Sequence, residues 1–242
     1  MKRFLWLILC LSFSIHLSGQ RNADYGIFGG VSSYIGDINT SRLLYSPMPA
    51  GGFFYRYNFH PRQALRANIF LGGIQGNDQD FNNNFQQERN DFFSGSVTEL
   101  AVQFEFNFLP YSTQGGKWDY TPYFAAGIGV AFNDVEANLW DPNNNEHIQI
   151  SHPVTPVAVI PFSLGFKLRI YKNLGLEAEY GFRKTFYDNF DGLEDLTDPS
   201  RKPWLHNNDW YSFTGISFTW KIYNRMAGCP AYSDVDDKRN KR

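Results

Sequence analysis

Polar or small side chains alternate with large apolar ones in Glu99-Leu100-Ala101-Val102-Gln103-Phe104-Glu105-Phe106-Asn107-Phe108. A β-strand points successive side chains to opposite faces, so the leucine, valine and phenylalanines share one face and the glutamates share the other. The same alternation recurs in residues 162–171, 176–183 and 215–222. Segments of about ten alternating residues separated by turn residues are the sequence signature of a membrane β-barrel.

Eight such segments follow one another along the chain. They are residues 25–37, 50–59, 64–76, 95–109, 120–133, 158–171, 174–187 and 210–223. Short connections (60–63, 110–119, 172–173) alternate with long polar ones (38–49, 77–94, 134–157, 188–209). We therefore predict an all-β fold, an eight-stranded antiparallel transmembrane β-barrel of up-and-down topology, with long outer loops, short periplasmic turns and both termini in the periplasm.

Residues 1–20 have the order of a cleavable secretory signal: Lys2 and Arg3, an apolar run over 4–15, then Ser18 and Gly19. Cys10 raises the possibility of a lipid anchor, but the large residue Leu9 precedes it, which disfavours lipidation. The predicted organisation is a signal peptide (1–20), a barrel (21–223) and a periplasmic C-terminal tail (224–242). With a formal net charge of −2 and interspersed signs, the chain offers no basic face for nucleic acid.

A soluble, lipocalin-like barrel is the alternative fold, because it also has eight up-and-down strands. Its apolar face would point inward, and alternation alone does not separate the two cases. Aromatic placement favours the membrane barrel, since aromatic residues gather near the strand ends as interfacial girdles do. These residues are Tyr55, Tyr57, Phe59, Tyr111, Trp118, Tyr120, Tyr171, Trp210 and Trp220.

If the apolar face meets lipid, the charged residues of the strands point into the barrel. The expected interior charges are Arg56, Arg66, Glu99, Glu105, Lys167, Arg169, Glu177, Glu179 and Arg183. An eight-stranded barrel is only wide enough for side chains to fill it, and confined charges are costly unless they pair. We expect a salt-bridged plug, with an ion path or proton relay as the alternative.

Catalytic and metal sites have weaker signals. Among His60, His147, His152 and His206, none lies on a predicted strand beside a serine and a carboxylate, so we expect no enzyme activity and no cofactor. His152 and His206 are the least unfavourable candidates for a catalytic base. Asp141, Glu146, His147 and His152 could bind a metal, and so could the acidic residues of 188–198, but neither set has a recognised ligand spacing.

The tail after residue 223 contains Cys229. Once Cys10 is removed with the signal, this cysteine has no partner in the mature chain, and the periplasm is an oxidising compartment. We expect either a frayed terminus or a docking segment in which Cys229 forms an intermolecular disulfide.

Several short motifs together resemble a Bacteroidota family of outer-membrane β-barrels that includes PorG, a component of the type IX secretion system. They lie at residues 29–37, 55–59, 64–68, 105–108, 121–123, 181–186, 209–211 and 229–230. The resemblance implies a non-catalytic subunit in the outer membrane of a Gram-negative bacterium. It would anchor the periplasmic ring built from a lipoprotein (PorK) and a periplasmic partner (PorN), with gliding motility as a linked phenotype if the organism glides. The alternative function is a small channel or a surface ligand-binding barrel.

Overall fold

The computed structural model describes residues 22–36, 38–39, 42–82, 84–112, 118–141, 146–186, 190 and 209–223. The expected signal peptide, residues 1–20, and the expected tail, residues 224–242, lie outside the described residues. The strands are β1 (Asn22–Ile35), β2 (Met48–His60), β3 (Gln63–Asn77), β4 (Phe92–Asn107), β5 (Tyr120–Asp141), β6 (Glu146–Tyr171), β7 (Leu174–Thr185) and β8 (Trp210–Tyr223). A 3-10 helix, η2 (Asp78–Asp80), and a short helix, α2 (Asn84–Arg89), lie between β3 and β4.

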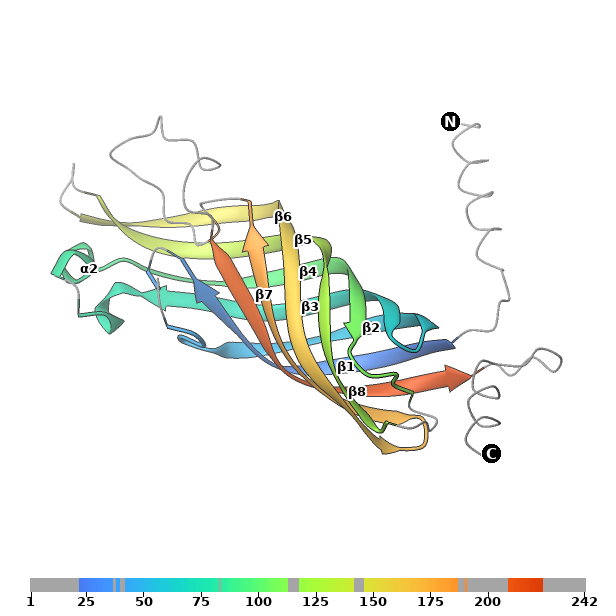
Figure 1. Cartoon of the computed structure of the whole chain (residues 1–242). Helices are drawn as coiled ribbons and strands as arrows, with labels where there is room; N and C mark the ends of the chain where they lie inside the picture. The colour runs from blue at the N-terminus through green and yellow to red at the C-terminus, as the bar shows by residue number, and fades with distance from the viewer. Residues whose placement is uncertain are drawn as a thin grey trace, which may run out of the picture.

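The eight strands close into one antiparallel barrel in which every strand pairs with its sequence neighbours (Figure 1). Closure is made by β1 and β8, whose register runs from Asn22 opposite Tyr223 to Ile35 opposite Trp210. We call the end with the tight connections at 61–62 and 172–173 the turn end, and the end with α2 the loop end; β1 starts and β8 finishes at the turn end (Figure 1). The predicted all-β, eight-stranded up-and-down barrel is confirmed.

One predicted loop is wrong. Residues 134–157 were expected to form a long polar connection, but β5 continues to Asp141 and β6 begins at Glu146. The two strands stay paired beyond a bulge next to Asn133. The reason is that Val135, Ala137 and Leu139 are fully buried on the inner side of this extension, so the segment has an apolar face to pack.

Polarity inverts along the long strands. On β4, the inward residues near the turn end are charged, as at Glu105, while Phe93 and Val97 near the loop end are inward and apolar. On β5 the outward side changes in the same way, from exposed Ile128 to polar residues beyond Asn133. At the turn end, therefore, the inward residues are polar and the outward residues are apolar. At the loop end the inward residues are apolar and the outward residues are polar.

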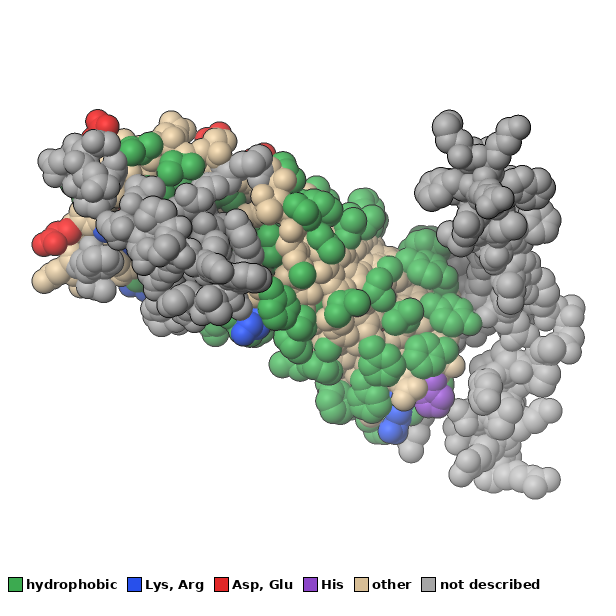
Figure 2. All heavy atoms as spheres, turned by 90° about the horizontal axis from the view of Figure 1, so that it is seen from above, with side chains coloured by type: hydrophobic (Ala, Val, Ile, Leu, Met, Phe, Trp, Pro, Cys, Tyr) green, Lys and Arg blue, Asp and Glu red, His purple; other side chains and the backbone are tan. Residues whose placement is uncertain are grey.

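The outer wall at the turn end is covered by exposed apolar side chains (Figure 2). They include Ile27, Phe53, Leu65, Ile69, Leu71, Leu100, Val102, Phe104, Ile128, Leu164, Phe166, Leu168, Ile216, Phe218 and Trp220. We call this surface the apolar band. A soluble protein rarely exposes so large a contiguous apolar surface. Because the apolar residues face outward and the charges inward, the lipocalin-like alternative, which needs the opposite arrangement, does not describe this barrel.

No helix within the described ranges is long and apolar enough to cross a membrane.

Candidate functional site: the interior of the barrel

Arg56 is the centre of the charged interior at the turn end. Its Nη1 and Nη2 atoms each donate a hydrogen bond of 2.6 Å to Glu177, one to each carboxylate oxygen. Its Nε atom donates to Glu105 at 3.0 Å, and Asp24 lies 3.6 Å from Nη1. This fork geometry is the strong, bidentate form of a charge-assisted hydrogen bond, and Arg56 is only 1% exposed.

Arg66, on the neighbouring strand, pairs with Glu179 across the interior. Its Nη1 atom lies 2.5 Å from Glu179, and the hydroxyl of Tyr123 donates to the same carboxylate oxygen at 2.6 Å. The side-chain oxygen of Gln103 accepts hydrogen bonds from Arg66 and, at 2.9 Å, from Asn68. A neutral amide thus satisfies the donors of Arg66 that the carboxylate does not reach.

Lys167 brings a third cation into the same region. Its ammonium group pairs with Glu105 and donates to Asn107 at 2.9 Å. It also lies 4.6 Å from the ring centroid of Tyr123, within the range of a cation–π contact. Glu105 therefore has cations on two sides, Arg56 and Lys167.

Arg183 forms a separate group nearer the loop end. Its Nε atom donates to Glu99 at 3.1 Å, and the hydroxyl of Tyr211 donates to the same oxygen at 2.6 Å. Its Nη1 and Nη2 atoms meet no hydrogen-bond acceptor among the described residues. The guanidinium carbon lies instead 4.8 Å from the ring centroid of Phe213.

The buried charged side chains of the strands, which we call the ionic layer, are equal in number for the two signs. Five acidic and five basic side chains, each at most 6% exposed, make up this layer among the described residues. They are Asp24, Glu99, Glu105, Glu177 and Glu179, and Arg56, Arg66, Lys167, Arg183 and Lys221. Removing one member of a buried ion pair leaves its partner's charge uncompensated, which is strongly destabilising. Each charged residue of the layer therefore needs its partner for the barrel to stay stable.

The structure places eight of the nine expected interior charges in this layer and one elsewhere. Arg169 pairs with Asp119 near the turn end, and its side chain is 24% exposed, because it comes just before the end of β6. The expected set also omits Asp24 and Lys221. Asp24 lies one residue before the predicted first strand, so extending the alternation by one residue would have found it, and Lys221 already lies on the polar face of the predicted last strand.

Aromatic side chains, which were not predicted, fill the lumen on the loop-end side of the Arg56 and Arg66 pairs. The aromatic layer consists of Phe28, Phe54, Phe70 and Phe213, each at most 4% exposed. Phe28 and Phe70 stack with their ring centroids 4.6 Å apart, and Phe213 meets Phe70 edge-on at 5.5 Å. The Phe54 ring centroid is 5.0 Å from the Arg56 guanidinium, so the two layers are in contact.

The loop end is organised by a buried carboxylate. Asp78 accepts two hydrogen bonds from Arg89, at 2.7 and 2.8 Å, and one from the backbone of Asp91. Tyr45 donates to Asp80 at 2.6 Å and is held to the backbone of Asn77. These contacts fix η2 and α2 against the connection between β1 and β2.

The described histidines lie far from one another. His60 is at the turn end, where its Nδ1 atom accepts from the backbone of Arg62, and His147 is at the loop end, where its ring lies 3.2 Å from the carbonyl oxygen of Asn90. The side chain of His152, all of His206 and most of the acidic segment 188–198 lie outside the description. Among the residues that are described, no three His, Cys, Asp or Glu side chains are placed to hold a metal ion.

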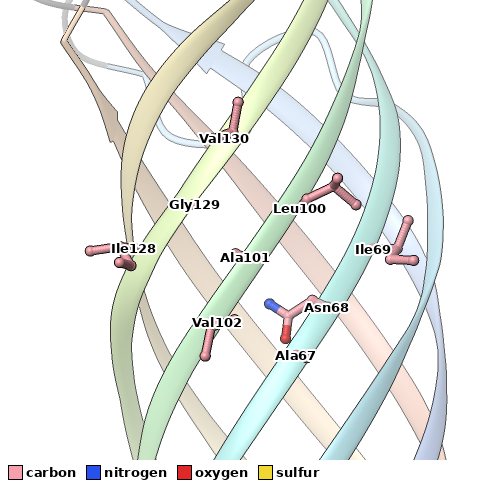
Figure 3. A pocket seen from close by; sticks show the side chains of 9 residues that line it. All are labelled: Ala67, Asn68, Ile69, Leu100, Ala101, Val102, Ile128, Gly129 and Val130. Carbon is pink, nitrogen blue, oxygen red and sulfur yellow. The ribbon is translucent and has the colours of Figure 1, made fainter. Parts of the chain in front are cut away.

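A groove of about 460 Å³ lies on the outer wall over β3, β4 and β5 (Figure 3). Its rim is formed by exposed apolar residues of the apolar band, among them Ile69, Leu100, Val102, Ile128 and Val130. The exposed side chains of this rim point away from the lumen.

The family model described as a domain of unknown function, DUF6089, matches residues 2–231. No curated protein matches the chain. Among solved structures, the chain is similar to Neisserial surface protein A (9% identity, TM-score 0.47, covering 85% of this chain and 100% of that chain). It is also similar to the N-terminal β-barrel domain of OprF from Pseudomonas aeruginosa (13%, 0.40, 84% and 100%) and to a major outer membrane protein from Thermus thermophilus (12%, 0.43, 83% and 99%).

Proposed function

Because this chain belongs to the DUF6089 family, whose function is unknown, we propose a role from its geometry: it is a non-catalytic outer-membrane barrel that anchors other proteins and conducts nothing. The observation that carries the proposal is the filled lumen. The Arg56, Arg66 and Lys167 pairs of the ionic layer close the barrel near the turn end, and the aromatic layer, beside the Arg183–Glu99 pair, closes it again toward the loop end.

The apolar band supports the membrane part of the proposal. A closed barrel satisfies its backbone hydrogen bonds internally, which is the condition for a β-structure to cross a bilayer. Its exposed Leu, Ile, Val and Phe side chains are those that hydrocarbon accepts, and Tyr57, Tyr120, Tyr171 and Trp220 are exposed toward the turn end as interfacial residues. Membrane lipid is therefore the first partner of this surface.

The closed lumen argues against transport. A channel of this size would need a continuous polar path, but the charges here pair with one another at hydrogen-bond distances. In planar bilayers we expect the refolded wild-type chain to insert without stable conductance steps. Regular steps that persist after repurification would contradict the proposal and favour a small channel.

The anchoring part rests on the sequence motifs that resemble the type IX secretion barrels. We propose that the chain has both termini in the periplasm and holds periplasmic ring subunits of that machine, of PorK and PorN type, through residues 224–242. Crosslinked cell envelopes with a tagged full-length chain should yield these subunits. The same envelopes with a chain ending at residue 223 should not, provided that both chains reach the membrane at equal levels. Equal recovery from both would contradict a role for the tail.

A further inference from the structure

One residue in the mouth of the loop end belongs to no strand. Phe190, from the connection between β7 and β8, is fully buried. Its ring lies parallel to that of Tyr211, with the centroids 5.1 Å apart and an interplanar angle of 6°. Tyr211 in turn meets Phe213 of the aromatic layer edge-on at 5.8 Å. Phe190 is thus linked through Tyr211 to Phe213 of the aromatic layer.

The backbone of Phe190 is held by side chains. Its N–H donates to Asp209 Oδ2 at 3.1 Å, and its carbonyl oxygen accepts from Asn133 Nδ2 at 2.9 Å. Asp209 is positioned by the hydroxyl of Tyr34, which donates to its other oxygen at 2.9 Å, and by Thr185, whose hydroxyl donates to its backbone oxygen at 2.7 Å. The donor Asn133 lies on β5, whereas the acceptor Asp209 immediately precedes β8 and the stacking ring of Tyr211 lies at the start of β8.

The contacts involve only the backbone N–H, the backbone C=O and the ring of Phe190. Any phenylalanine in an extended peptide has the same three groups. Nothing in them depends on Phe190 being part of this chain. The socket also has an acceptor left over, because Asn133 Oδ1 finds no donor among the described residues although Asn133 is 4% exposed. A buried polar atom without a partner is costly, and a longer peptide could supply the missing N–H.

We propose that this socket, formed by Asn133, Asp209 and Tyr211, with Tyr34 positioning Asp209, is a binding site for one aromatic residue of an extended peptide from a partner, and that Phe190 occupies it in cis. Exchange would replace Phe190 by the partner's residue and leave the socket filled. This inference goes beyond the anchoring role and does not depend on it, since it concerns the opposite end of the barrel.

The test removes the side chain of Phe190 from the socket and adds a small molecule that carries the same ring and peptide groups. The full chain with Phe190→Gly, in detergent micelles, is titrated with N-acetyl-phenylalaninamide and followed by isothermal calorimetry. We expect saturable binding, none with N-acetyl-glycinamide, and affinity about tenfold weaker after the further change Asn133→Ala, which removes one hydrogen bond. Asn138→Ala is the matched control, because Asn138 lies on the same strand but faces outward, and it should leave the affinity unchanged.

The wild-type chain decides whether exchange occurs. Phe190 competes for the socket, so the wild type should bind the same probe, but more weakly than the glycine variant. Phe190→Leu, which keeps the backbone contacts and loses only the ring, guards against misfolding of the glycine variant and should bind with intermediate affinity. The proposal is overturned if folded Phe190→Gly and Phe190→Leu bind no probe, or if they bind it while the wild type never does.

Discussion

Arg56 on β2 and Glu177 on β7 are joined by two hydrogen bonds of 2.6 Å, although β1 and β8 lie between their strands in the barrel wall. The pair therefore crosses the lumen. No backbone register connects these two strands, so their side chains are what ties them together. Glu105, on β4, accepts from the same guanidinium and extends the tie to a third strand.

Replacing Arg56 should be among the most damaging single changes in the barrel. Arg56→Met leaves Glu177 and Glu105 facing each other with less compensation, and breaking a buried ion pair in this way costs about 3–5 kcal/mol. Denaturant unfolding in detergent micelles measures the loss of unfolding free energy.

The double variant Arg56→Met/Glu177→Met should lose less unfolding free energy than the two single variants together, because neither charge is then left alone. Arg169→Met is the control: its pair with Asp119 is partly exposed, so the cost should stay below about 1 kcal/mol. Equal losses at positions 56 and 169 would contradict the burial argument.

The two layers should block ions in series. Arg56→Ser/Glu177→Ser opens space in the ionic layer only, and Phe70→Ala/Phe213→Ala opens space in the aromatic layer only. We expect neither double variant to conduct in planar bilayers, and we expect the quadruple variant to show conductance steps. Current through either double variant would mean that one layer alone seals the lumen.

Tyr45 gives the loop end a measurable pH response. Burial of the phenol and its hydrogen bond to Asp80 raise the pKa of Tyr45 from 10.0 to about 12. Because the folded state favours the neutral phenol, this contribution to stability is complete below pH 10 and is lost as the pH rises from 10 toward 12. The ultraviolet titration of the wild type minus that of Tyr45→Phe should show a single transition near pH 12. Asp80→Asn should move this transition to lower pH; a transition at pH 10 in the wild type would refute the assigned environment.

Cys229 offers a covalent test of docking at the turn end. If it forms an intermolecular disulfide with a periplasmic subunit, non-reducing electrophoresis of membranes should give a high-mass band. That band should disappear on reduction and in the variant Cys229→Ser. Cys10→Ser serves as a control, because this position belongs to the expected signal peptide. A monomer band that is the same in all three chains would remove the disulfide from the proposal.

Local alternation was enough to predict the strands and the sides of the wall. Leu100 and Glu105 occupy the faces that the sequence assigns to them, because a strand has only two faces and only one of them can meet hydrocarbon. The end of the apolar band was harder to find. Beyond Asn133 the apolar residues Val135, Ala137 and Leu139 face inward, and the polar residues between them look like a loop unless the reversal is recognised.

Sequence patterns did not predict which side chains meet across the lumen. The sequence assigns Arg56 and Glu177 to the interior, but their meeting depends on barrel closure and on the relative heights of two strands that do not pair. Phe190 was hidden for a different reason. It is one of two aromatic residues, with Trp204, in the long polar connection predicted at 188–209, and its backbone contacts are with Asp209 and Asn133, which are distant in sequence.

The polarity inversion on β4 and β5 also limits the height of the apolar band along the barrel axis. On β4 and the residue that follows it, the outward apolar residues run from Leu100 to Phe108, which is about 26 Å of chain and, at a tilt near 40°, about 20 Å along the barrel axis. Sinking the barrel further would carry Asp134 and Glu136 into hydrocarbon, and raising it would expose the band to water. The inversion thus limits how deeply the barrel can enter a bilayer, because the boundary between hydrocarbon and water must lie on the turn-end side of Asp134 and Glu136.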